Sequence, residues 1–181
     1  CDHSENDLVV REEKDGWCLG EWCTPGPVVL PAPFVNNYFY VKALEKVIEI
    51  AEHIGKSEDI PLLKKRMEER KNAIMVAYFN PWDGNFLGMQ QGANAFALDI
   101  GLGNEKTKAN FIKYYDDLGY LDTGIFGTDI VVRLLFEYGR QDIAIKLLTA
   151  KEPHGFGRWQ QDGATTLWEY WFDSRSHSHP M

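Results

Sequence analysis

Apolar residues recur at helical spacing through most of this chain. Between residues 34 and 54 they fall at positions 34, 38, 41, 44, 48 and 51, and charged residues take the other side of the same cycle. This spacing predicts an amphipathic helix of about five turns that ends at Gly55. A second helix is predicted directly after it, because Leu63, Met67 and Ile74 share one face and Pro61 lies in the first turn, where proline is tolerated.

The rest of the chain alternates between two kinds of segment. Residues 89–103 and 127–139 are apolar or small on nearly every side, whereas residues 104–119 and 140–150 have one polar face. A helix that is apolar all round is usually buried, and one with a polar face usually lies at the surface. We therefore predict six helices in three antiparallel hairpins, arranged as an inner and an outer layer, after an irregular Gly- and Pro-rich segment over residues 1–33.

The predicted fold class is all-α, with residues 34–181 forming a complete or partial ring of helical hairpins. A plain helical bundle or a solenoid has the same periodicity and stays open as an alternative at this point. A β-rich fold is disfavoured, because the only long run rich in β-branched residues, IVVRLLF, has flanks that suit a helix better.

Composition and charge narrow the classes of partner. The chain has 181 residues, 44% of them hydrophobic, which is enough for the core of one domain. Its formal net charge is -8 and it has no block of Lys and Arg, so nucleic acid is not an expected partner. No stretch approaches the ~20 apolar residues that span a bilayer, so no membrane segment is expected. A neutral substrate rich in hydroxyl groups would meet no repulsion from this charge.

The cysteines and histidines do not form a recognisable metal site. Cys18 and Cys23 are near enough in sequence for a local disulfide, but WCLGEWC lacks the paired spacing and the His partners of a zinc site, and ordinary thiols are the favoured interpretation. His177 and His179 are separated by one residue and have no evident third ligand. No metal or organic cofactor is expected.

Aromatic residues and carboxylates gather in the predicted loops, above all in the stretch GATTLWEYW. A flat aromatic face beside a charged acceptor suits the C–H surface and the hydroxyls of a sugar ring. Hydrolysis of a glycosidic bond needs two carboxyl groups, one as acid and one as base or nucleophile. Glu169, between Trp168 and Trp171, is the strongest candidate for such a group. The plainer interpretations are a solvated or arginine-paired Glu and tryptophans that fill the core.

Four elements of the sequence together resemble the catalytic domain of bacterial alpha-L-rhamnosidases. They are GEW at residues 20–22, TGIFGT, GATTLWEYW and SHSHPM, in this order, and the likeness extends from about Asp15 to Met181. GATTLWEYW is the most specific of the four. The resemblance implies an (α/α)6 barrel, of which this chain would hold about six of the twelve helices, and an inverting hydrolase of terminal alpha-L-rhamnosides.

The resemblance also implies roles for individual residues. The family's general base falls on Glu169, and a histidine that contacts the substrate falls on His179. The acidic residue of the family's G-D-W element falls on Glu21, with Trp22 beside it, and the family's aromatic positions imply Trp159, Trp168 and Trp171 as walls of the sugar site. Two departures stand out: Glu replaces the usual Asp at position 21, and Ser178 stands where Asn usually precedes the His.

The general acid of the family belongs to a segment of the type R-D-E-R-x-G-W-x-G-D, and we expect that segment to lie before residue 1. The chain begins without Met and is expected to be a piece of a longer polypeptide that holds the base but lacks the acid and is inactive alone. An open half-ring is also expected to self-associate or to depend on the missing half. The alternatives are a non-catalytic carbohydrate-binding or scaffold protein of the same fold, and another (α/α)6 glycosidase.

Overall fold

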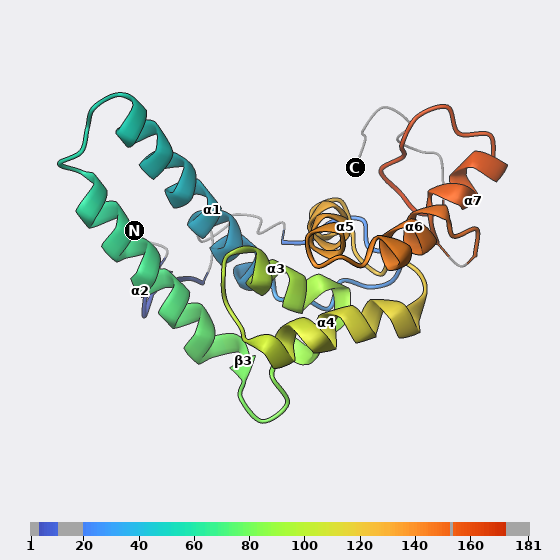
Figure 1. The fold of residues 1–181 in the computed structure, drawn as a ribbon, viewed down its shortest axis with the longest axis horizontal. Helices are drawn as coiled ribbons and strands as arrows, with labels where there is room; N and C mark the ends of the chain where they lie inside the picture. The colour runs from blue at the N-terminus through green and yellow to red at the C-terminus, as the bar shows by residue number, and fades with distance from the viewer. Residues whose placement is uncertain (1–3, 11–19, 153, 173–181) are drawn as a thin grey trace.

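The computed structural model of this chain describes residues 4–10, 20–152 and 154–172. Seven α-helices follow one another in the described part (Figure 1). They are α1 (Ala32–His53), α2 (Ile60–Tyr78), α3 (Ala93–Asp99), α4 (Glu105–Leu118), α5 (Gly127–Glu137), α6 (Gln141–Thr149) and α7 (Phe156–Gln161). Two antiparallel pairs of two-residue strands, β1 (Ser4–Glu5) with β2 (Leu8–Val9) and β3 (Phe79–Asn80) with β4 (Asn85–Phe86), complete the fold together with a 3₁₀ segment, η1 (Leu87–Gly92).

The first six helices form three hairpins in two layers. Helix α1 packs against α2, α3 against α4, and α5 against α6. The inner row is α1, α3 and α5, because α3 contacts both of the others, and α4 and α6 lie beside each other on the outside. Figure 1 shows the α1–α2 hairpin at one end of the molecule and α7 at the other. The predicted arrangement of three hairpins as part of a ring is confirmed, and α7 is a seventh helix that the pattern did not predict.

The apolar positions predicted for the first helix are its buried face. Phe34, Tyr38, Val41, Leu44, Ile48 and Ala51 are all buried along α1. At the start of this helix the aromatic rings pack edge to face, with the Phe34 and Tyr38 rings 6.2 Å and 5.0 Å from the ring of Phe96 on α3. Such pairs stabilise a core beyond their buried area. This contact joins the first hairpin to the second.

The ends of α4 are fixed by local sequence. The side chain of Asn104 accepts hydrogen bonds from the backbone N–H groups of Lys106 and Thr107, and the Thr107 hydroxyl accepts from the Asn104 N–H, which is a reciprocal capping box. Gly119 ends the helix in the left-handed region at φ 73°. These two signals account for the close agreement between the predicted helix over residues 104–119 and α4.

The prediction that a helix begins at residue 89 is wrong. Residues 87–92 form η1, in which Met89 and Gln91 both have positive φ, and α3 begins only at Ala93. The backbone N–H of Gln91 donates to Asp122, and the Gln91 side chain binds the backbone of Pro27 and Val29. Contacts from distant loops therefore satisfy polar groups that a helix would have satisfied locally.

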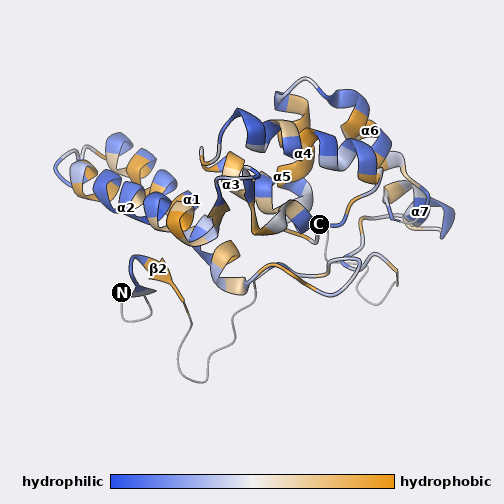
Figure 2. Ribbon diagram, turned by 90° about the horizontal axis from the view of Figure 1, so that it is seen from below, coloured by the Kyte–Doolittle hydropathy of each residue, from blue (hydrophilic) through white to orange (hydrophobic). Residues whose placement is uncertain are grey.

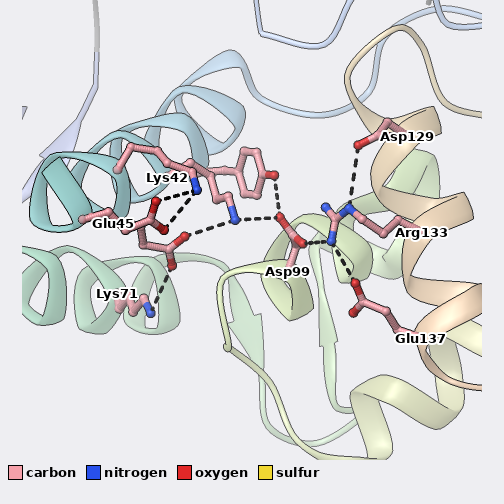
Figure 3. Close-up of polar contacts among 10 residues, drawn as sticks. Lys42, Glu45, Lys71, Asp99, Asp129, Arg133 and Glu137 are labelled. Atoms are coloured by element: carbon pink, nitrogen blue, oxygen red, sulfur yellow. Dashed lines mark hydrogen bonds and ion pairs between the residues drawn. The ribbon is translucent and has the colours of Figure 1, made fainter. Parts of the chain in front are cut away.

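A charged network ties the inner helices together (Figure 3). The side chain of Asp99, at the end of α3, is 3% exposed and lies 2.6 Å from the guanidinium of Arg133 on α5. It also accepts a hydrogen bond of 2.6 Å from the Tyr38 hydroxyl, and the ammonium of Lys42 lies 3.4 Å away, both on α1. Although burial alone would raise the pKa of the Asp99 carboxyl, these partners together hold it below its usual range.

One side of α1 stays exposed and apolar. Phe39, Val47, Ile50 and Ile54 are between 40% and 66% exposed and recur at helical spacing. Figure 2 shows hydrophobic and hydrophilic residues alternating along both helices of the α1–α2 hairpin. Within the described residues, no helix is both long and apolar enough to cross a bilayer.

Candidate active site

Glu169 lies in the loop after α7 and contacts the segment that precedes α1. Its Oε1 atom accepts a hydrogen bond of 2.9 Å from the indole N–H of Trp22, although the two residues are 147 positions apart. Both side chains are partly exposed. The thiol of Cys23 also interacts with the Glu169 carboxylate; burial and this negative charge raise the pKa of Cys23 to about 12. The site therefore holds one half-exposed carboxylate with two donor side chains from adjacent residues.

Glu21 lies beneath this contact, 1% exposed, and its carboxylate holds the start of α5. It accepts backbone N–H groups from Trp22 at 3.2 Å, Phe126 at 3.1 Å and Gly127 at 2.9 Å. The amides at a helix N-terminus favour a negative charge. Burial opposes ionisation more strongly than the three donors favour it, and it raises the pKa of Glu21 to about 7.

The loop over residues 121–126, directly before α5, packs on the segment before α1 that carries Trp22. The backbone N–H of Ile125 donates to the carbonyl of Trp22 at 3.0 Å. A Cβ at Gly124 would lie 2.7 Å from both the carbonyl carbon of Trp22 and Oε1 of Glu21, and closer still to the Trp22 carbonyl oxygen. Only glycine fits at this crossing, which gives the TGIFGT element a steric reason.

Three tryptophans support the Glu169 loop from below. Trp159, Trp168 and Trp171 are 2%, 7% and 4% exposed, and the Trp159 ring lies 5.9 Å and 5.1 Å from the other two. The Trp159 indole N–H donates to the carbonyl of Trp171 at 3.1 Å, and the Trp171 indole N–H donates to the carbonyl of Thr123 at 2.9 Å. The loop that carries Glu169 is thereby attached to α7 and to the turn before α5.

Asp122 is a second carboxylate at this end of the molecule, held by donors from three directions. It accepts hydrogen bonds from the backbone of Gln91 and from the hydroxyls of Tyr114 and Tyr115, at 2.6 to 2.9 Å. It also lines a cavity of about 340 Å³, whose wall includes the Tyr120 and His154 rings. The His154 ring lies 4.5 Å from the ring of Phe172, just beyond the Glu169 loop.

The structure brings together three of the residues that the sequence singled out. Glu21, Trp22 and Glu169 are in one chain of contacts, although they come from opposite ends of the sequence. Cys23 belongs to the same contacts and was not predicted; its position next to Trp22 was the available signal. His179 lies outside the described residues. Among the residues that the structure does describe, no three His, Cys, Asp or Glu side chains lie close enough to hold a metal.

Comparison with known families identifies the family of the chain. The profile of the bacterial alpha-L-rhamnosidase six-hairpin glycosidase domain matches residues 1–181. The chain belongs to this family. An alpha-L-rhamnosidase of Formosa agariphila is 26% identical to the chain; the match covers 90% of the chain but 20% of that protein. The chain thus spans about a fifth of the length of this curated relative.

Solved structures show the same fold. The crystal structure of Streptomyces avermitilis alpha-L-rhamnosidase complexed with L-rhamnose superposes with a TM-score of 0.80 at 23% identity, covering 94% of this chain and 16% of that one. An alpha-L-rhamnosidase from Dictyoglumus thermophilum gives a TM-score of 0.78 at 24% identity, covering 97% of this chain and 20% of that one. The chain therefore forms part of an (α/α)6 toroid, as predicted.

Proposed function

We propose that this rhamnosidase domain is part of a glycoside hydrolase that removes terminal alpha-L-rhamnose from glycosides or polysaccharides by an inverting mechanism. Family membership and the fold support the reaction class. The hydrogen bond between Trp22 and Glu169 is the observation that carries the assignment of a catalytic group, because it holds a half-exposed carboxylate in one orientation at the end of the inner helices. In an inverting reaction that carboxylate removes a proton from the attacking water.

The proposed sugar contacts come from buried tryptophans next to Glu169. The indole N–H groups of Trp159 and Trp171 are bound to backbone carbonyls, so these rings can offer the sugar only an apolar edge or face. Trp168 and His179 complete the proposed wall. Glu21 is buried with its oxygens turned toward backbone amides, and its direct contact with the sugar stays a prediction.

The segment over residues 11–21 contains candidates for the general acid. It has the sequence R-E-E-K-D-G-W-C-L-G-E, which follows the family pattern R-D-E-R-x-G-W-x-G-D with one additional residue before Gly20. We therefore propose that Glu12 or Glu13 supplies the acid, in place of a segment before residue 1. Both residues lie outside the described part of the structure. Inversion requires the two carboxyl groups to be roughly 6.5 to 9.5 Å apart, with water between the base and the sugar.

Residues 1–181 alone are proposed to have little activity even with both carboxyl groups present. The described helices form part of a ring, so one side of the site would stay open to water, which weakens the electrostatic contacts that catalysis uses. The exposed apolar side of α1 supports self-association or dependence on further helices. Light scattering on residues 1–181 tests this; a stable monomer would contradict it.

Hydrolysis of a chromogenic alpha-L-rhamnoside tests the assignment of Glu169. The full-length protein is compared with its Glu169→Gln variant, with residues 1–181 alone, and with Glu68→Gln, which removes an exposed carboxylate on α2. We expect Glu169→Gln to lower kcat by roughly 10²- to 10⁴-fold and Glu68→Gln to act as wild type. NMR of the first product should show the inverted anomer. Rhamnose binding without any hydrolysis by the full-length protein would instead favour a carbohydrate-binding module.

A further inference from the structure

The backbone of Trp22 is fixed on both sides. Its N–H donates to the Glu21 carboxylate, and its carbonyl accepts the N–H of Ile125. Gly124 approaches so closely that no side chain fits between the two segments. The next residue, Cys23, has φ 58°, a left-handed conformation that is strained for a residue with a side chain. The chain thus accepts local strain at the position where two neighbouring side chains, those of Trp22 and Cys23, reach Glu169.

The indole of Trp22 extends from this fixed backbone to Glu169. Its only polar atom, the N–H group, is directed at Oε1 of Glu169 at 2.9 Å. The indole N–H groups of Trp159 and Trp171 are bound to backbone carbonyls, whereas that of Trp22 is bound to the carboxylate proposed as the base. Glu169 itself sits in a loop without helix or strand, so its orientation depends on such contacts.

We infer that Trp22 is a positioning residue for Glu169 and not a wall of the sugar site. This inference rests on the proposed role of Glu169 as the base. The indole N–H holds one carboxylate oxygen and so fixes the direction in which the carboxylate meets the attacking water. The Cys23 thiol faces the same carboxylate, and donation by both groups favours its ionised form.

Kinetics of Trp22→Phe in the full-length protein separate positioning from sugar contact. Phe keeps an aromatic face but removes the N–H. We expect kcat to fall by roughly 10- to 100-fold with KM changed by less than about threefold, since a misdirected group slows the chemical step more than binding. The acidic limb of the pH profile of kcat/KM should move to higher pH, because the ionised carboxylate loses a donor. Trp82→Phe, which changes a tryptophan that is 90% exposed, is the matched control.

A second variant tests whether the N–H group itself matters. The Nε2 atom of His corresponds to the indole nitrogen along the side chain, so Trp22→His offers an N–H at the same place. At pH 8, where an ordinary imidazole is neutral, Trp22→His should retain more of kcat than Trp22→Phe. A Trp22→Phe variant that raises KM while kcat and the pH profile stay unchanged would overturn the inference in favour of a sugar wall.

A spectroscopic measurement keeps this test independent of the proposed function. In the full-length protein labelled with ¹⁵N-tryptophan, the Trp22 indole resonance is assigned by its loss in Trp22→Phe. We expect this resonance to shift with the titration of a carboxyl group, and the shift to disappear in Glu169→Gln. Absence of any pH-dependent shift would refute the contact. Failure of the wild type to hydrolyse rhamnosides would refute the proposed function and leave this measurement to decide about Trp22.

Discussion

Replacement of Gly124 by Ala should disrupt the site without touching any proposed catalytic group. The added Cβ would lie 2.7 Å from the Trp22 carbonyl carbon, whereas unbonded carbon atoms pack at about 3.5 to 4.0 Å. The turn before α5 and the Trp22 segment must therefore separate by on the order of 1 Å. The hydrogen bond from Ile125 to the Trp22 carbonyl, now 3.0 Å, would then exceed the range for N–H···O bonds of about 2.7 to 3.2 Å.

The magnitude follows from what that separation breaks. One backbone hydrogen bond between half-buried residues is lost and the Glu21 carboxylate is displaced from its donors, which together should cost about 2 to 4 kcal/mol of the free energy of unfolding. A shift of about 1 Å at Trp22 also carries its indole away from Glu169, and a misplacement of this size lowers catalytic rates by about 10²-fold.

The assay pairs thermal unfolding with hydrolysis of the chromogenic rhamnoside. Gly26→Ala is the matched control, because Gly26 lies in the same N-terminal segment and a Cβ there meets no atom within 4 Å. We expect Gly26→Ala to match the wild type and Gly124→Ala to lose both stability and activity. If Gly124→Ala keeps its unfolding temperature and its activity to within about twofold, the close crossing does not position Trp22 and the reasoning is wrong.

Two further predictions concern buried carboxylates. Asp99→Asn should lower the free energy of unfolding by about 1 to 3 kcal/mol, between the values for an exposed pair and for a fully buried pair, because Arg133 is partly exposed. The pKa of Asp99 is depressed in the folded state, so urea titrations should show this difference near neutral pH and its loss as the pH falls below about 4. The pH dependence for Glu21 has the opposite sign, because its pKa in the folded state, about 7, lies above the ordinary value of 4.5. Its contribution to the free energy of unfolding is therefore greatest below pH 4.5 and is lost as the pH rises through 7. As the pH is lowered from 8 to 5, the wild type should therefore gain stability relative to Glu21→Gln. A difference in the free energy of unfolding that does not change with pH would contradict this.

The helical architecture could be predicted from the sequence because it depends on local periodicity. The predicted core positions of α1 are its buried face, and Asn104 and Gly119 mark both ends of α4. Gly88 and Gly92 were local signs that the helix predicted from residue 89 would start late, since both adopt positive φ. That start was missed because contacts of Gln91 with Asp122 and with Pro27, far away in the sequence, replace the helical hydrogen bonds.

The sequence by itself determined the hairpins, the buried faces of the helices and, through GATTLWEYW, Glu169 as the candidate base. Only the tertiary structure decided what surrounds Glu169. It placed Trp22 and Cys23 on its carboxylate and turned Glu21 inward to the start of α5. The physical reason is that periodicity reports which face of a helix is buried, whereas the direction of a loop side chain is set by the distant backbone and side-chain groups that complete its hydrogen bonds.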